Sequence, residues 1–127
     1  MHARAIQGAE FPAAIESGIV LVDFWAAWCG PCRAFAPIFE RSAAAHPDVR
    51  YLKVDTEAEP ELAGALRVSS IPTVMAFRDG IMLFRHAGLI PEDGLRSLVE
   101  QLRGLDMNEI RAKLEAPEEP APDDAAT

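Results

Sequence analysis

Two cysteines, Cys29 and Cys32, are the residues of this sequence best suited to chemistry. They are the only cysteines among 127 residues, and two residues separate them. A pair so close in the chain cannot link distant segments, and small proteins held together by disulfides usually carry several cysteine pairs. The pair therefore indicates a reactive site or a metal site rather than a structural cross-link.

The position of the pair favours thiolate chemistry. A strand-like run, residues 19–25, precedes it, and a helical pattern over residues 31–45 follows. The free N–H groups and the dipole at a helix N-terminus stabilise negative charge, so they favour the Cys29 thiolate, which is the nucleophile of disulfide exchange. We expect Cys29 to attack a disulfide of a partner protein. Cys32, one turn further along and more sheltered, would then resolve the mixed disulfide once a base has taken its proton.

Two other interpretations of the pair stay open. The cysteines could form half of a zinc site completed by a second chain, because a structural zinc takes more ligands than this pair supplies. The other candidate ligands in the chain are three scattered histidines: His2, His46 and His86. The cysteines could also be unreactive residues of the core.

The hydrophobic pattern predicts the elements that hold the pair in place. Strand-like runs occur at residues 4–6, 19–25, 50–55, 73–78 and 81–86. Helical patterns fill the intervals between and after them, at residues 10–16, 31–45, 57–66 and 91–103. Helices between strands imply parallel pairing, and the dipeptide Asp79-Gly80 predicts a hairpin that adds antiparallel strands. We therefore expect an α/β fold in which a central mixed sheet carries helices on both faces.

The composition of the chain predicts three parts. Residues 1–104 carry the strands and helices of one domain, and residues 105–115 predict a short added helix with Leu105, Ile110 and Leu114 on one side. Residues 116–127 consist of Pro, Ala, acidic residues and a final Thr, and are predicted to form a disordered acidic tail. The extension is either a solvated addition or a docking segment for a partner.

Charge and hydropathy restrict the classes of binding partner and the cellular compartment that we expect. The formal net charge is −8, whereas nucleic acids and anionic lipids bind basic surfaces. The first strongly apolar run, residues 19–27, is too short to span a bilayer and contains Asp23, and the residues before it lack the pattern of a secretory signal. We therefore expect a cytoplasmic protein that binds neither nucleic acid nor a membrane.

Four motifs give the sequence a resemblance to a known family. Residues 22–32 read VDFWAAWCGPC, residues 70–73 read SIPT, residues 77–80 read FRDG and residues 87–88 read AG. They resemble the cysteine signature, the cis-proline loop, the hairpin turn and the glycine loop of the thioredoxin family, in that order along the chain. The resemblance covers residues 6–102 and implies the thioredoxin fold.

The resemblance also implies an activity. The dipeptide Gly30-Pro31 between the cysteines is typical of family members that reduce protein disulfides, whereas isomerases and strong oxidants usually carry His at the second place. The chain is thus expected to be a monomeric protein-disulfide reductase whose clients are proteins with accessible disulfides. An NADPH-dependent thioredoxin reductase would recharge it. No bound cofactor or metal is expected, because the cysteine pair is itself the redox group.

Two ionisable residues gain roles from the same resemblance. Asp23 lies in the middle of an apolar strand, where an ionised carboxylate is costly and its pKa should rise. The matching aspartate of the family is the buried proton acceptor that helps the second cysteine, here Cys32, to react. Lys53 matches the buried lysine that pairs with that aspartate. A purely structural ion pair is the alternative.

The remaining predicted site residues form the surface that meets the substrate. They are Trp28, Gly30, Pro31, Ile71, Pro72, Ala87 and Gly88. Trp28 is expected in a flat apolar rim, and a cis Pro72 would place the backbone of Ile71 beside the cysteines. Trp25 is assigned to the core or to a structural flank, and Arg33 to the solvated surface.

Two other functions compete with a general reductase. A holdase or scaffold would use the fold and its added helix to grip a partner, and it would keep this activity after Cys32→Ser. A reductase dedicated to one client would need both thiols but a narrower surface.

Overall fold

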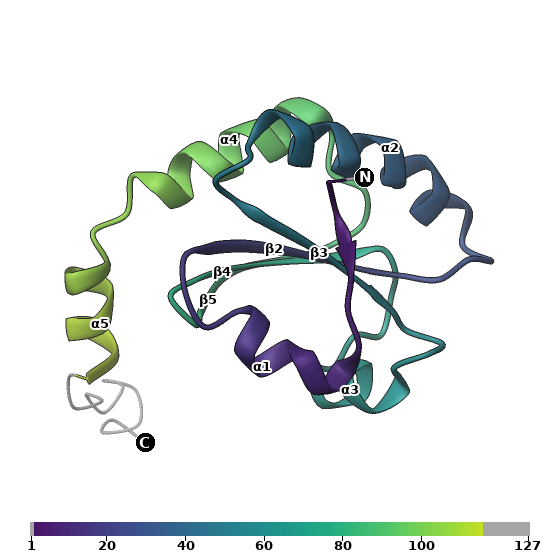
Figure 1. The fold of residues 1–127 in the computed structure, drawn as a ribbon, viewed down its shortest axis with the longest axis horizontal. Helices are drawn as coiled ribbons and strands as arrows, with labels where there is room; N and C mark the ends of the chain where they lie inside the picture. The colour runs from purple at the N-terminus through teal and green to yellow at the C-terminus, as the bar shows by residue number, and fades with distance from the viewer. Residues whose placement is uncertain (1, 116–127) are drawn as a thin grey trace, which may run out of the picture.

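The computed structural model describes residues 2–115, and a five-stranded mixed sheet forms its centre (Figure 1). The strands are β1 (Arg4–Ala5), β2 (Ile19–Trp25), β3 (Arg50–Asp55), β4 (Thr73–Arg78) and β5 (Ile81–Ala87). Their order across the sheet is β1-β3-β2-β4-β5. β1, β3 and β2 run parallel, whereas β4 and β5 are antiparallel to their neighbours, so the expected mixed sheet is confirmed.

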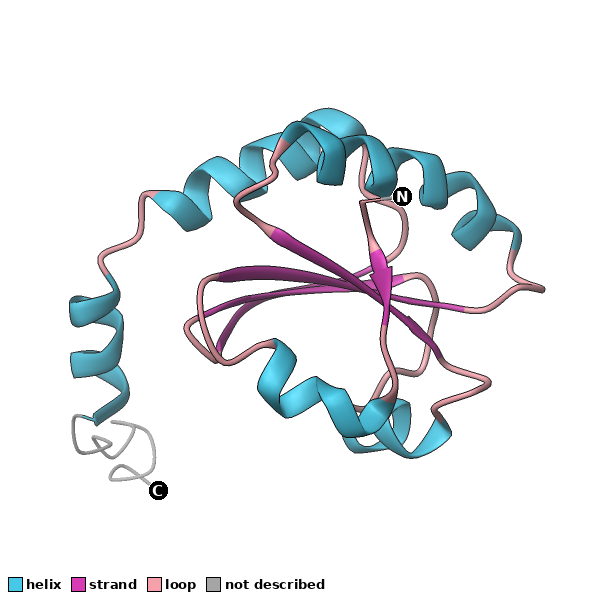
Figure 2. Ribbon diagram, viewed as in Figure 1, coloured by secondary structure: helices cyan, strands magenta, loops and turns pink. Residues whose placement is uncertain are grey.

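Helices cover both faces of this sheet (Figure 2). The helical elements are η1 (Gly8–Glu10), α1 (Phe11–Ala14), α2 (Gly30–Ala45), α3 (Pro60–Ala65), α4 (Glu92–Arg103) and α5 (Met107–Glu115). Helices α2 and α4 lie on one face, and α1 and α3 lie on the other (Figure 1). This layering buries β2 at the centre of the molecule.

The alternation of side chains along β2 builds two cores. Leu21 points toward α2 and α4, where it packs with residues such as Phe35 and Leu95. Val22 and its neighbours at alternate positions point to the opposite face and pack with Phe11. Both layers consist of side chains with almost no exposed surface, so the central strand is apolar on both sides. Asp23 interrupts that pattern.

The hairpin forms where the sequence predicted it. Asp79 and Gly80 both have positive φ, 52° and 83° respectively, as a two-residue turn of this type requires. The Asp79 carboxylate accepts a hydrogen bond from the backbone N–H of Gly18 at 3.0 Å, which ties the hairpin to the start of β2.

Some element boundaries differ from the predicted ones. The helix expected at residues 57–66 begins only at Pro60, because the Asp55 carboxylate accepts hydrogen bonds from the backbone N–H groups of Glu57 and Ala58 and holds a turn there. The helix expected at residues 10–16 is divided into η1 and α1 and ends at Ala14. The long helix α2 runs on through Pro37 and ends at Ala45, as the predicted range did.

The added helix α5 is attached to the end of the sheet. Arg78, the last residue of β4, donates hydrogen bonds from its guanidinium to the carbonyl groups of Leu102 and Leu105 at 2.6 and 2.9 Å. Arg111 of α5 lies 3.7 Å from the Asp79 carboxylate, and Met107 is buried. The division of the chain at residues 104 and 115 stays a prediction. The tail predicted at residues 116–127 lies outside the described residues.

Candidate active site

Cys29 and Cys32 occupy the junction between β2 and α2, and their sulfurs are joined in a disulfide. Cys29 is the N-cap residue of α2, and its Sγ accepts a hydrogen bond from the backbone N–H of Cys32 at 3.2 Å. Cys29 is 5% exposed and Cys32 is 2% exposed, so Cys32 is the more sheltered of the two, as expected. A reduced Cys29 sulfur at this position would have its negative charge stabilised by the helix terminus.

The loop before β4 lies against the cysteine pair. The Ile71–Pro72 peptide bond is cis, and the carbonyl oxygen of Ile71 lies 3.7 Å from Cys29 Sγ. The backbone N–H of Gly88 donates to the carbonyl oxygen of Pro72 at 2.7 Å, which brings the end of β5 to the same place. Ala87 is exposed and pairs with Thr73 at the adjoining end of β4.

Trp28 forms the outer side of the site. Its side chain is 67% exposed although it is large and apolar, and it directly precedes Cys29. Gly30 and Pro31, the first residues of α2, are exposed beside it. The structure therefore brings the predicted surface residues together around the disulfide.

Asp23 lies below this surface in the central strand. It is 1% exposed, and within the described part of the chain neither carboxylate oxygen has a hydrogen-bond partner. Burial raises the pKa of the Asp23 carboxyl from 3.8 to about 7, and the positive charge of Lys53 opposes the rise. Asp23 shares the sheet face of Leu21, whose cluster includes Phe35 of α2. A group that titrates near neutral pH thus lies on the α2 side of the sheet.

Lys53 is placed differently from the expected direct pair with Asp23. The two residues are register partners on the parallel strands β2 and β3. However, the Lys53 ammonium lies 4.8 Å from the centroid of the Trp25 ring, and the Asp23 oxygens stay without a hydrogen bond. A cation over an indole face is an attractive arrangement, and it draws the flexible lysine stem along the strand. Lys53 therefore acts on Asp23 through its charge rather than by contact.

The sequence interpretation missed several contacts that hold the site in shape. Arg33 is exposed, as expected, and in addition its guanidinium donates to the carbonyl oxygen of Ala27 at 2.9 Å and ties the loop before Cys29 to α2. Thr73 donates from its hydroxyl to the carbonyl oxygen of Ser70 and closes the cis-proline loop. Both contacts are local in the chain, but the residue types alone gave no signal for them.

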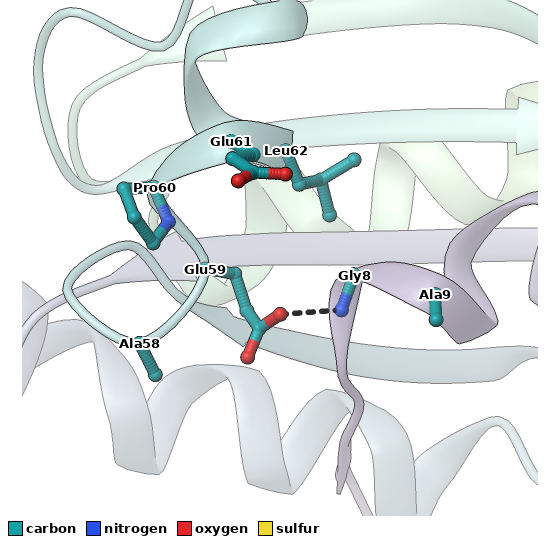
Figure 3. A pocket seen from close by; sticks show the side chains of 7 residues that line it. All are labelled: Gly8, Ala9, Ala58, Glu59, Pro60, Glu61 and Leu62. Atoms are coloured by element: carbon teal, nitrogen blue, oxygen red, sulfur yellow. Dashed lines mark hydrogen bonds between the residues drawn. The ribbon is translucent and has the colours of Figure 1, made fainter.

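Other features of the described residues carry no comparable chemistry. A hollow of about 730 Å³ lies between the turn after β1 and the start of α3 (Figure 3). There Glu59 accepts a hydrogen bond from the backbone N–H of Gly8 at 2.7 Å, which fixes that turn (Figure 3). Residues 2–115 contain no group of three or more potential metal-binding side chains. None of their helices has both the length and the hydropathy needed to cross a bilayer.

Sequence comparison relates this chain to known proteins. The thioredoxin family model matches residues 2–101. A Streptomyces coelicolor protein that carries a thioredoxin name is 50% identical over 96 residues, which cover 76% of this chain and 72% of that protein. Thioredoxin from Chlamydia trachomatis is 42% identical over 98 residues, which cover 77% of this chain and 96% of that protein.

Structural comparison agrees with the sequence comparison. A mutant thioredoxin from Halobacterium salinarum superimposes with a TM-score of 0.75 at 34% identity, and the match covers 82% of this chain and 93% of that one. Together with the disulfide at the start of α2, these matches identify both the fold and the redox group. The chain belongs to the thioredoxin family, and it is a thiol–disulfide oxidoreductase whose redox group is the Cys29–Cys32 pair.

Proposed function

We propose that this protein reduces disulfides of other proteins, with Cys29 as the nucleophile and Cys32 as the resolving thiol. The observation that carries this assignment of roles is the position of Cys29 as the N-cap of α2, with the N–H of Cys32 directed at its sulfur. A thiolate on Cys29 receives that hydrogen bond and the field of the helix terminus, whereas Cys32 lies within the first turn and is more buried. Thioredoxin-family proteins act on disulfide substrates and are reduced by thioredoxin reductase.

The proposed reaction has two exchange steps. The Cys29 thiolate attacks one sulfur of the client disulfide, forms a mixed disulfide and releases the other client sulfur as a thiolate. The Cys32 thiolate then attacks Cys29, which forms the intramolecular disulfide and releases the second client sulfur. The client gains two electrons and this protein loses two, so its oxidised form is the Cys29–Cys32 disulfide. An NADPH-dependent thioredoxin reductase would supply two electrons to open it again.

Asp23 is proposed as the group that accepts the proton of Cys32. Its carboxyl has a pKa of about 7 and lies on the sheet face that α2 covers, so it can take up and release a proton at neutral pH. Lys53 is proposed to keep a part of the Asp23 population ionised, because its charge lowers the pKa that burial raises. The absence of any hydrogen bond to the Asp23 oxygens in the described residues supports this role, since they are free to accept one.

The client is proposed to bind across the exposed surface around Cys29. Three segments of the chain contribute residues to this surface. These residues are Trp28, Gly30 and Pro31, then Ile71 and Pro72, and finally Ala87 and Gly88. The exposed Trp28 supplies apolar area next to the nucleophile, and the backbone of Ile71 lies where an extended client segment would pair with it. We further propose that the protein works as a monomer in the cytoplasm, where reductant is available to recycle it.

The test is insulin reduction with dithiothreitol as the electron source. We expect rapid turnover by the native protein and loss of turnover in both Cys29→Ser and Cys32→Ser. After reduction and removal of dithiothreitol, the Cys32→Ser variant should accumulate a mixed disulfide with insulin, detectable by mass, and Cys29→Ser should not. If Cys32→Ser kept its turnover, the proposed resolving step would be wrong. If the native protein gave no turnover, a general reductase would be excluded in favour of a client-specific or scaffolding protein.

A further inference from the structure

An apolar groove runs along the outer edge of the sheet, between β5 and α4. It consists of two hollows of about 310 and 280 Å³. Both hollows are lined by Phe84, Leu98 and Gln101, so they adjoin each other. Of the residues that line both hollows, Phe84 and Leu98 are apolar and Gln101 is polar.

One end of the groove reaches the redox site. The first hollow is lined at this end by His86 and Leu89, which flank the segment that contains Gly88. Gly88 is hydrogen bonded to the carbonyl oxygen of Pro72, next to the residue that contacts Cys29. Leu89 is 38% exposed despite its apolar side chain. A client whose disulfide lies on Cys29 must pass over the neighbouring surface, and on this side that surface leads into the groove.

The other end of the groove is built by the added helix. Leu105 and Ile110 line the second hollow, and both lie beyond residue 101, where the match to the family model ends. Figure 1 shows α5 turning away from the end of α4 beside the β4–β5 end of the sheet. The contacts of Arg78 and Arg111 described above hold it there. The extension therefore contributes part of the lining at this end of the groove, beside residues that belong to the part matching the family.

The wall opposite α4 is an edge strand. β5 is the last strand in the sheet order and pairs only with β4 among the described strands. The outer edge of such a strand offers backbone groups to an extended segment, whose side chains would alternate between the groove and the solvent. Shape and chemistry therefore favour an extended segment with apolar residues at alternate positions.

We propose that this groove binds an apolar, extended segment of the client that flanks the disulfide under attack, which makes such segments the preferred substrate class. The proposal rests on the proposed function, because it requires the client disulfide to be at Cys29. It extends the client surface away from the cysteine pair along β5 to α5. The apolar side chains buried in the groove would raise the rate of attack by increasing the affinity for the client.

The test measures how fast the reduced protein reacts with short peptides. The single cysteine of each peptide is capped by thionitrobenzoate, and the rate is followed by the release of this coloured thiol. One peptide carries about six residues of alternating Val or Leu and Thr beside the cysteine, which span about 20 Å when extended. Its control has Ser or Gly in place of Val and Leu. The apolar peptide and its control are each made in two versions, one with the segment before the cysteine and one with the segment after it. The free reagent, dithiobisnitrobenzoate, measures the redox site alone.

We expect the native protein to react about tenfold faster with the apolar peptide in one of the two orientations. Gln101→Glu and Gln101→Lys place a charge in the groove from an exposed helical position and should reduce this preference at least threefold or so. Leu114→Glu is the matched control, since Leu114 is 65% exposed on α5 and does not line the groove. All these proteins should react equally with dithiobisnitrobenzoate.

Equal rates with both peptides in both orientations would overturn the proposal, as would a preference that both Gln101 variants keep. A loss of preference in Leu114→Glu as large as in Gln101→Glu would overturn it too, because it would assign the effect to overall charge. Failure of the native protein to react with dithiobisnitrobenzoate would instead refute the proposed function.

Discussion

Replacing Asp23 with asparagine should stabilise the folded protein at alkaline pH and leave its stability near pH 4 almost unchanged. The Asp23 side chain is buried in the central strand, and its oxygens have no hydrogen-bond partner within the described part of the chain. Desolvation therefore raises the pKa of this carboxyl, against the opposing charge of Lys53. Asparagine has nearly the same shape as protonated aspartic acid but cannot ionise.

The direction of the pH dependence follows from proton binding. The carboxyl binds its proton below a pH of about 7 in the folded protein and below 3.8 in the unfolded chain. Between these values the folded state holds more protons, so the free energy of unfolding falls as the pH rises. Each pKa unit corresponds to about 1.4 kcal/mol. The rise from 3.8 to about 7 thus corresponds to about 4 kcal/mol, lost almost entirely by pH 8.

The assay is urea unfolding of the oxidised native protein and of Asp23→Asn at several pH values between 4 and 8. The difference in the free energy of unfolding should grow from near zero at the acidic end to about 4 kcal/mol at the alkaline end. Glu100→Gln is the control for the loss of one negative charge, since it removes an exposed carboxylate in α4. A constant difference between Asp23→Asn and the native protein across the range would refute the reasoning.

Three further substitutions test contacts that do not involve the titration of Asp23. Trp28→Ala should slow the reduction of insulin by about threefold to tenfold and leave that of dithiobisnitrobenzoate unchanged, because it removes exposed apolar area beside the nucleophile. Arg78→Met should cost about 1–2 kcal/mol in urea unfolding and speed amide exchange in α5, since it removes hydrogen bonds to the carbonyl groups around the end of α4. Tyr51→Phe should cost about 1–2 kcal/mol because it leaves the buried hydroxyl of Ser42 without its 2.6 Å partner. The added change Ser42→Ala should recover part of that loss, and an additive loss would contradict this account.

The sequence predicted the parts of the fold whose signals are local. The bounds of β2, β3 and β4 follow from apolar runs that end at clear breaks, and they agree with the structure to the residue. The hairpin at Asp79-Gly80 was predictable because few residue pairs adopt two consecutive positive φ angles. The cysteine pair was placed correctly at the helix start for a related reason, since its strand and helix are adjacent in the chain.

Features that depend on tertiary competition were not predictable in this way. The resemblance implied that Lys53 pairs with Asp23, and the two are register partners, but neither it nor the residue types predicted that the Lys53 ammonium would lie over an indole face. The start of α3 was misplaced because the Asp55 side chain competes for N–H groups that a helix would otherwise use. The groove could not be predicted from the sequence either. Phe84 and Ile110 are distant in the sequence, and only the packing of α5 brings them to the same hollow.

The burial of Asp23 has a free-energy cost that the packing around it must offset. At alkaline pH its ionised carboxylate costs about 4 kcal/mol, which is a large share of the stability of a domain this size. Leu21 and Phe35, on the same face of the sheet as Asp23, are fully buried, and each fully buried side chain of this kind contributes about 1.5–3 kcal/mol. The apolar surroundings that offset the cost are the same ones that create it, because they exclude the water that would stabilise the anion. Since the carboxylate has neither a hydrogen bond nor a contact ion pair in the described residues, packing gives no account of its presence, and this favours the proton-transfer role proposed for it.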